Sequence, residues 1–599
     1  MRTRRSGAVA LLATAALILT GCTAPPRPLV AGSSVAVAWT TPFTSYNAHT
    51  TFGATSANRN ITYATLSGFN YFDNDLSLVR NTTFGSYQKL SDNPLVVKYT
   101  IADGVSWSDG SAVDAADLLL QWAALSGAEN TADFDPSRFA DAKTGEFRAL
   151  PKKVVYFDAD ASRIGFRASS RVPDISEDRK SITVTFDRPV ADWETAMAAP
   201  LPAHIVVKHA LGISDSDQAE DALIDAVRSH DVSALSKISS FWNSGFNFSR
   251  MPADHDLLVS DGPYRITGIH SKQAVTLTAN PRYTGENQPK IQTIAVRVVV
   301  DPLAAVAALE NNEVQVIAPK PSGQVLDDLK AIKAKTLIAP GASNERIVLQ
   351  FGPSKNDTFD NPLVRRAFLK VIPRREIAKS VVAPLQKRAA VRDSLVFFPG
   401  QPGYRESVKQ NGSSAYRSVD IDGAKALLDR AGGTKPTVCI LFDPENPSRV
   451  EEFALIKKSA GLAGFKVTDC SSPDWRDRLG MPAIYDAALY STTAASAEVS
   501  ERDLAVFDAD NPQNHNSYDN PSVTALIAKW RGETDAIERR AIERRIDTHL
   551  WHDSYGETLY QAPALTAYDE KAVAHIAPSA VVPTYFWNIW DWEPVTEAR

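Results

Sequence analysis

Short runs of alternating or continuous hydrophobic residues recur along the first half of the chain and predict β-strands. Residues 35–39 (VAVAW) form the first run, and residues 95–101 (LVVKYTI) alternate as in a strand with one buried face. Residues 261–300 contain three more such runs and predict a block of strands. Extended structure is therefore expected to make up much of this half.

Two helices in the same half are marked by their start signals. Asp114 stands in the N-cap position before an apolar segment at residues 118–125, and Asp117 follows it three residues later. Pro302 stands at the first position of a helix that is expected to end near residues 311–312. Both segments are predicted as helices that pack on the strands around them.

Three segments follow neither period. Residues 41–47 (TPFTSYN) predict a loop with two aromatic rings, and residues 127–180 are polar and predict an elaborated surface region. Residues 241–248 (FWNSGFNF) are dense in aromatic rings, which predicts a loop or the wall of a pocket.

Strands and helices alternate in the second half of the chain. A strand predicted at residues 345–351 precedes a helix at 361–368, and a further helix at 422–431 is closed by two glycines. Residues 437–470 then predict a strand, a helix and a second strand. Alternation of this kind favours α/β packing.

Cys439 and Cys470 lie in the two apolar stretches of that last unit. A helix that connects two strands allows them to run in parallel within one sheet. Outside the cytoplasm, neighbouring thiols form disulfides. The sequence allows two readings, a disulfide between these cysteines or two buried free thiols.

The amino-terminal residues have the layout of an export signal. Basic residues at positions 2, 4 and 5 precede an uncharged segment at residues 7–20, which ends at Gly21-Cys22. The segment is too short to span a bilayer as a helix. We therefore interpret residues 1–21 as a signal peptide.

The tetrad Leu19-Thr20-Gly21-Cys22 resembles the bacterial lipobox. This resemblance implies that the Cys22 thiol receives a diacylglyceryl group, and two or more acyl chains hold a protein stably on a membrane. Residues 22–34 are rich in Pro and Ser and predict a tether. The alternative is an ordinary secreted protein with a cysteine at this position by chance.

Length and charge narrow the class of protein. A chain of 599 residues is too long for one hydrophobic core, so two or more domains are expected. The composition, with 44% hydrophobic and 22% charged residues, is that of a globular protein, and no later apolar run is long enough for a membrane span. The formal net charge of −6 becomes more negative when the signal is removed, which argues against nucleic-acid binding.

Seven stretches, taken together and in order, resemble the family 5 extracytoplasmic solute-binding proteins of ABC importers, the dipeptide/oligopeptide-binding class. These stretches are ADGVSWSDGSAVDAADLLLQW (102–122), LPAHIV (201–206), DGPYRI (261–266) with LTANPRY (277–283), AAVAALENNEVQVI (304–317), FDNPLVRRAFL (359–369), DGAKALLDRAG (422–432), and SYDNPSVTALI (517–527) leading to LYQAP (559–563). They extend over nearly the whole mature chain.

The resemblance implies an α/β, two-lobed periplasmic-binding-protein-like fold of type II with a cleft between the lobes. Lobe I is expected at 35–318 and 562–599, with an extra subdomain at about 60–200, and lobe II at 319–561. Closure of the lobes on a peptide-like or other small solute would deliver it to a membrane permease. The implied setting is a monomer that is lipid-anchored on the extracytoplasmic face of the cell membrane, with an ABC permease and ATPase complex as partners.

Cleft walls need groups that stack on a ligand and hydrogen-bond to it. From lobe I we expect aromatic contacts, and from lobe II we expect residues of the strand at 485–490 and of the second crossover. The predicted ligand-binding residues are Phe43, Tyr46, Trp242, Phe246, Tyr490, Thr492, Tyr560 and Gln561.

The sequence departs from the family's pattern at one position of this site. Many peptide-binding members carry a Trp and an Asp after the strand at 485–490, and the Asp pairs with the terminal ammonium of the peptide. Here those places fall on Thr492 and Ala495, so no charged anchor stands there unless Glu498 takes its role. A buried unpaired ammonium is costly, which argues against recognition of a free peptide amino terminus at this place.

Other classes of function have less support in the sequence. No GxSxG, HExxH, Walker A, GxGxxG or CxxC pattern indicates an enzyme, and we expect neither a cofactor nor a metal. His549 and His552 share a predicted helix, but spacing specifies no third metal ligand. The alternative function is a non-transport lipoprotein that uses the same fold to sense or scaffold assembly of the cell envelope.

Overall fold

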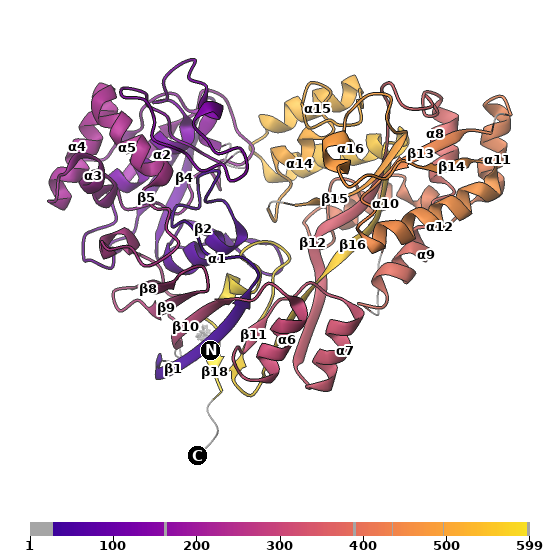
Figure 1. The fold of residues 1–599 in the computed structure, drawn as a ribbon. Coiled ribbons are helices and arrows are strands. Elements are labelled where there is room, and N and C mark those ends of the chain that lie inside the picture. The colour runs from indigo at the N-terminus through magenta and orange to yellow at the C-terminus, as the bar shows by residue number, and fades with distance from the viewer. Residues whose placement is uncertain (1–27, 161–164, 387–390, 434, 495, 596–599) are drawn as a thin grey trace, which may run out of the picture.

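The computed structural model describes residues 28–160, 165–386, 391–433, 435–494 and 496–595. Two lobes are joined at their base and diverge above it, so that the ribbon has the outline of a V (Figure 1). Cys22, the predicted lipidation site, lies outside the described residues. Within the described ranges, no helix is long and apolar enough to cross a membrane.

One sheet continues from one lobe into the other, and ten strands of the described chain belong to it. Their order is β14-β13-β15-β12-β16-β11-β1-β10-β9-β8. The strands are β1 (Val30–Trp39), β8 (Tyr264–His270), β9 (Ala274–Ala279), β10 (Ile291–Val298), β11 (Val316–Ile317), β12 (Lys335–Leu349), β13 (Thr437–Leu441), β14 (Lys466–Asp469), β15 (Ala487–Thr493) and β16 (Gly556–Tyr568).

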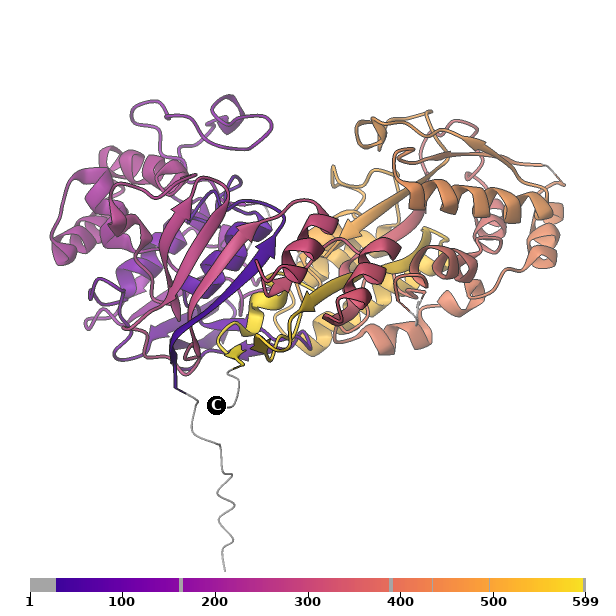
Figure 2. The ribbon, with the colours of Figure 1, turned by 60° about the horizontal axis from the view of Figure 1, so that its bottom comes forward.

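The antiparallel pair β12 and β16 connects the two lobes. Their register runs from Lys335 opposite Tyr568 to Val348 opposite Gly556, with two irregularities between these ends. Figures 1 and 2 agree that these strands run from the base of the molecule into the second lobe. The chain enters the second lobe along β12 and leaves it along β16.

Two large hydrophobic cores define the lobes. One core extends from Val35 to Val296 and includes residues of the carboxy-terminal segment such as Trp592. The other extends from Ile347 to Tyr560, and it also takes in Ala191 from the first half of the chain. We call the parts around these cores lobe I and lobe II.

Lobe I contains a second sheet and most of the amino-terminal helices. Its second sheet has the order β4-β5-β7-β6. The further elements of this lobe are α1 (Ser56–Thr65), β2 (Asn70–Phe72), β3 (Leu78–Arg80), β4 (Gly85–Asp92), β5 (Leu95–Ile101), α2 (Ala115–Ser126), β6 (Asp174–Ile175), β7 (Ser181–Thr185), α3 (Ala203–Leu211), α4 (Ser216–Ser229) and α5 (Val232–Ser244), together with β17 (Val573–Ala574) and β18 (Glu593–Pro594) from the end of the chain.

Helix α2 is buried along its whole length, and its start is fixed by buried carboxylates. The Asp114 side chain accepts from the Ala116 N–H, and the Asp117 side chain accepts from the Asp114 N–H, as the sequence predicts. Asp117 also accepts hydrogen bonds from Trp107 Nε1 and from the Ala203 N–H. Burial, with the neighbouring charge of Asp114, raises the pKa of Asp117 to about 7.

Helices surround the strands of lobe II, and a smaller apolar cluster lies at the base. The helices of lobe II are α8 (Pro362–Leu369), α9 (Arg374–Ile377), α10 (Tyr404–Gln410), α11 (Ile421–Arg430), α12 (Pro447–Ala463), α13 (Trp475–Arg478), α14 (Glu501–Ala505), α15 (Pro521–Arg531) and α16 (Ala536–His552). At the base, α6 (Pro302–Glu310) and α7 (Gly323–Ala331) pack against β11 and against Leu565 of β16.

One predicted segment is corrected by the structure. Residues 241–244, which were expected in a loop, form the last turn of α5. The helix begins at an N-cap formed by Asp231, and it buries Leu235, Ile238 and Trp242 on one face. The aromatic residues of this segment therefore belong to the end of an amphipathic helix and to the turn that follows it, which is why no regular spacing of hydrophobic residues was visible in the sequence.

Cys439 and Cys470 form a disulfide. Strand β13 carries Cys439 and runs parallel to β14, after which Cys470 follows directly, and α12 connects the two strands. The bond closes a loop with a sequence separation of 31 residues at the outer edge of the main sheet. It therefore restrains the unfolded form of lobe II.

Replacing both cysteines with serine is expected to lower the free energy of unfolding by about 2–4 kcal/mol, because the loop is no longer closed in the unfolded chain. Urea denaturation followed by circular dichroism measures the loss. Reduction of the unmodified protein with dithiothreitol should cause the same loss of stability. The doubly substituted protein is the control, because dithiothreitol should not change its stability. An unmodified protein whose midpoint does not move on reduction would contradict this account.

Candidate ligand-binding site

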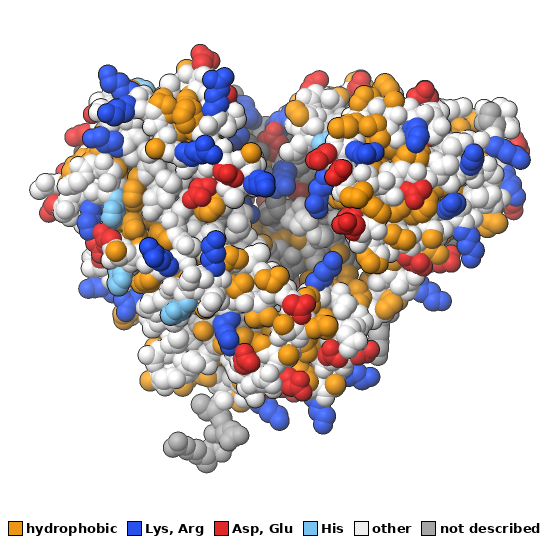
Figure 3. Space-filling view, in the orientation of Figure 1, with side chains coloured by type: hydrophobic (Ala, Val, Ile, Leu, Met, Phe, Trp, Pro, Cys, Tyr) orange, Lys and Arg blue, Asp and Glu red, His pale blue; other side chains and the backbone are white. Residues whose placement is uncertain are grey.

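A cavity of about 370 Å³ lies between the lobes and is lined from both sides. In the space-filling view, the surface between the lobes is deeply hollowed (Figure 3). Lobe I contributes residues of α1 and β2 and the segment 188–199. Lobe II contributes residues 496–502 and side chains of α15 and α16, and the carboxy-terminal segment adds Trp590.

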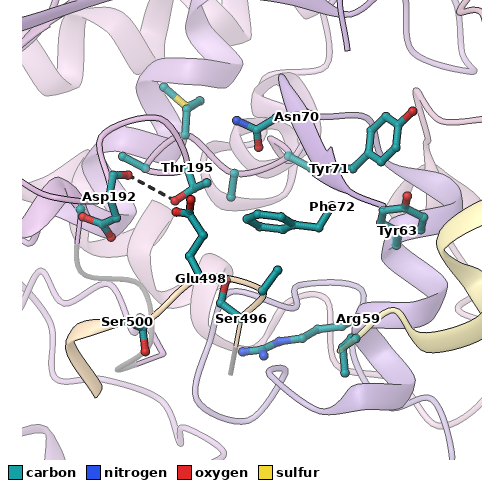
Figure 4. Close-up of a pocket in the computed structure, with 18 of the residues that line it drawn as sticks. Arg59, Tyr63, Asn70, Tyr71, Phe72, Asp192, Thr195, Ser496, Glu498 and Ser500 are labelled. Carbon is teal, nitrogen blue, oxygen red and sulfur yellow. Dashed lines mark hydrogen bonds between the residues drawn. The ribbon is translucent and has the colours of Figure 1, made fainter. Parts of the chain in front are cut away.

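Aromatic rings form one wall of the cavity. The rings of Tyr63 and Trp590 are stacked with centroids 5.6 Å apart, and the Tyr71 ring meets Trp590 edge-on at 5.4 Å. The Tyr63 hydroxyl donates to the Trp587 carbonyl at 2.7 Å, which fixes the ring. Figure 4 shows Phe72 between this wall and the opposite side of the cavity. Such a wall can stack on a planar or apolar part of a solute.

The opposite side of the cavity is acidic. Figure 4 shows the Glu498 side chain extending from lobe II toward Asp192 and Thr195 of lobe I. The Asp192 carbonyl accepts from the Thr195 N–H at 3.0 Å, which makes a tight turn in the segment that carries the carboxylate. Burial raises the pKa of Asp192, and the charges of Glu501 and Glu498 add to this effect while Arg539 opposes it.

Arg539 of α16 connects the lobes beside this acidic side. Its Nη2 donates to Glu498 Oε2 at 2.9 Å, and its Nη1 donates to the carbonyl of Ala191 in lobe I. Close by, Trp193 Nε1 of lobe I donates to the Thr534 carbonyl of lobe II at 3.1 Å. We call the contacts of Arg539 with Ala191 and of Trp193 with Thr534 the polar latch.

A second contact between the lobes is apolar. Leu76 of lobe I packs in one cluster with Phe398 and Ala497 of lobe II and with Val581 of the carboxy-terminal segment. Ala497 and Val581 also line the cavity. The polar latch and this cluster together bring the lobes into contact around the cavity.

The four aromatic residues predicted from lobe I lie in the core of that lobe and not on the cavity wall. Phe43, Tyr46, Trp242 and Phe246 are all buried. Tyr46 donates its hydroxyl to the Val259 carbonyl at 3.1 Å, and Trp242 Nε1 donates to the Asp158 carbonyl at 3.0 Å. Because both polar atoms are satisfied within lobe I, their predicted ligand contacts find no support in this geometry.

The four residues predicted from lobe II lie along β15 and β16, and their side chains contact neighbouring elements of the protein. Tyr560 donates to Glu452 Oε1 at 2.7 Å, and Thr492 Oγ1 accepts from Asn344 Nδ2 at 2.8 Å. Gln561 donates to the Gly341 carbonyl of β12, and Tyr490 packs against the core of lobe II. None of these four described residues lines the cavity.

The residues that do line the cavity come largely from segments that the sequence patterns did not single out. Glu498 is the exception, because the departure at Thr492 and Ala495 pointed to it. Ala495 itself lies outside the described residues. The pair Tyr71-Phe72 was a signal that could have been used, since adjacent aromatic residues on a strand of only three residues are not both expected in a core, and both line the cavity.

Metal ligands do not gather in the described part of the chain. Among its residues, no group of three or more His, Cys, Asp or Glu side chains is arranged to hold a metal ion. His552 Nδ1 instead lies 3.1 Å from Asp553 Oδ1 at the end of α16.

Comparison with known proteins relates the chain to extracellular binding proteins. The family model described as bacterial extracellular solute-binding proteins, family 5 Middle, matches residues 83–501. The uncharacterized lipoprotein Rv2585c of Mycobacterium tuberculosis is 26% identical over 543 residues, which is 86% of this chain and 85% of the relative. The oligopeptide-binding protein OppA of Mycobacterium tuberculosis is 22% identical over 494 residues, or 81% of this chain and 72% of the relative.

A solved structure has the same fold. The periplasmic EDTA-binding protein EppA superposes with a TM-score of 0.74 at 21% identity, and the match covers 98% of this chain and 100% of that one. The predicted fold class, a two-lobed α/β periplasmic-binding-protein fold, is thereby confirmed.

Replacing Arg539 with alanine is expected to shift the equilibrium toward an open form by about tenfold or more, because the charged hydrogen bond across the lobes to the Ala191 carbonyl is lost. Small-angle X-ray scattering should record a larger radius of gyration. Arg540→Ala removes the same charge from the next position of α16, which takes no part in the polar latch, and should leave the scattering curve unchanged. Identical curves for the Arg539 variant and the unmodified protein would refute the latch.

Proposed function

Because the chain belongs to the bacterial extracellular solute-binding proteins of family 5, we propose that it is the substrate-binding lipoprotein of an ABC transporter. In this role it captures a peptide-like or other small solute by closure of its lobes and delivers it to a membrane permease. The family binds solutes and is not enzymatic. The proposed partners are the permease and ATPase of the transporter.

The observation that carries this proposal is that the cavity is lined from both lobes. Tyr63 and Asp192 reach it from lobe I, while Glu498 reaches it from lobe II. A solute that touches both lobes makes its full set of contacts only when they are closed. Its binding therefore stabilises the closed form, which is a shape that a permease can distinguish from the open one.

The size of the cavity favours a small solute. A volume of about 370 Å³ lies near the lower end of the roughly 300–1,000 Å³ found for small-molecule sites. The name of OppA supports a peptide-like solute, whereas the name of EppA shows that the same fold serves a different kind of ligand. We propose a short solute and not an extended chain.

The proposed location is the outer face of the cell membrane, with Cys22 as the anchor. The relative Rv2585c is named as a lipoprotein, and its match covers most of both chains. Strand β1 begins at the base of lobe I, on the side away from the open end between the lobes (Figure 1). An anchor that precedes β1 therefore leaves the entrance to the cavity accessible.

A solute that copurifies with the protein is expected in native mass spectrometry, and a second, acyl-derived mass is expected on the mature amino terminus. Removing the solute by mild unfolding should lower the melting temperature. Adding the solute back at 100 times its Kd should raise the free energy of unfolding by about 2.7 kcal/mol. Small-angle X-ray scattering should then show a more compact protein. A protein that binds no solute, and whose deletion leaves solute uptake unchanged, would favour a role in envelope assembly instead.

A further inference from the structure

Among the described acidic groups that line the cavity, Asp192 differs in forming no direct ion pair, although Arg539 lies near enough to oppose the rise in its pKa that burial causes. Glu498 is paired with Arg539 at 2.9 Å, and Glu501 with Arg531 at 2.8 Å. Asp192 also lines the cavity and is partly buried, yet within the described residues no basic side chain forms an ion pair with it.

An unpaired carboxylate in this place is unfavourable for the protein alone. Closure of the lobes removes it from much of the surrounding water, and a charge that is buried without a partner destabilises the closed form. The negative charges of Glu498 and Glu501 lie on the lobe that closes onto it. Closing the empty cavity brings these two negative charges toward Asp192 together with the single positive charge of Arg539, which Glu498 already shares.

The nearby arginines are already engaged by protein groups. Arg539 is held by Glu498 and by the Ala191 carbonyl. Arg531 lies 2.8 Å from Asp508 as well as from Glu501. Arg188 and Arg502 also line the cavity, but both are exposed, so that solvent screens their charges. The acidic side of the cavity therefore has few positively charged groups available to bind an anionic solute.

We propose that the cavity selects solutes with a cationic nitrogen, an amine or a guanidinium, which Asp192 binds directly with Glu498 as the second carboxylate. This inference rests on the proposed function and specifies its substrate class. The cation adds positive charge beside Asp192, where Arg539 is shared with Glu498, so binding and closure stabilise each other. The aromatic wall of Tyr63, Tyr71 and Trp590 takes the apolar part of the same solute.

The geometry also explains how a cationic solute is accepted without an acidic residue directly after β15. Thr492 of β15 is bonded to Asn344, and its hydroxyl holds neighbouring strands together. Asp192, by contrast, belongs to lobe I, and Glu498 extends toward it from lobe II on the acidic side of the cavity (Figure 4). The carboxylates come from opposite lobes, so a bound cation joins the lobes directly.

The test is a titration of matched probes that differ in charge alone: phenethylamine, 2-phenylethanol and phenylacetate, with the peptide Ala-Phe-Ala and its N-acetyl form as a second pair. Calorimetry on the full protein should show the cationic member of each set binding at least about tenfold more tightly than its neutral or anionic counterpart. Asp192→Asn should remove this preference, and Asp192→Glu should restore most of it.

Two further variants separate the site from a general effect of charge. Glu498→Gln should weaken binding of the cationic probes by a smaller factor than Asp192→Asn. Asp225→Asn removes an equal charge from the exposed surface of α4, outside the cavity, and should change nothing. Melting temperatures of the empty proteins establish that each variant is folded.

The outcomes distinguish this inference from the proposed function. Tighter binding of the neutral or anionic probes overturns the choice of a cation and leaves a solute-binding role intact. A preference for cations that survives in Asp192→Asn overturns the assignment to Asp192. Failure of all probes, in a protein that also carries no copurified solute, counts against both.

Discussion

The pairing of β12 with β16 is the constraint on which the rest of the structure depends. Along the described chain, the backbone passes from one lobe to the other only through these two strands, once in each direction. Their antiparallel register extends from Lys335 to Val348, which fixes how the lobes face each other. The register is irregular between Pro340 and Asn344, where the strands pass from the base into lobe II. A break in the ladder at this level permits bending there without loss of the pairing on either side.

Buried charged groups next to β12 and β16 make this part of lobe II rigid. Arg449 donates to Glu345 of β12 at 2.9 Å, and Tyr560 of β16 donates to Glu452 at 2.7 Å. Burial raises the pKa of Glu452, and the charge of Glu345 raises it further. Such a network is costly unless its members keep their geometry, so it holds β12, β15 and β16 in one arrangement. Glu498 follows β15 in the sequence and is therefore positioned by this rigid group of strands.

The sequence was sufficient for elements whose signal is local. The strand at Leu95–Ile101 and the helix capped by Asp114 occur where their patterns placed them, because alternation and capping act within a few residues. The cavity wall could not be found in this way. An aromatic residue in a loop or a very short strand has the same local pattern whether it points into a core, as Tyr46 does, or into a cavity, as Tyr71 does. The difference is set by contacts between segments that lie far apart in the sequence, such as Tyr63 with Trp590.

The separation of scaffold and wall also explains how one fold accommodates different ligands. The sheet and its two cores depend on backbone pairing and apolar packing, which tolerate few changes in Ile347 or Val97. Asp192 and Glu498 stand on irregular segments, where a substitution alters the charge of the cavity without breaking a sheet or a core. In the proposed mode of binding, Asp192 does from lobe I what an acidic group directly after β15 would do from lobe II. With Asp192 on lobe I, a bound cation adds an attraction between the lobes to the contacts that the polar latch already makes.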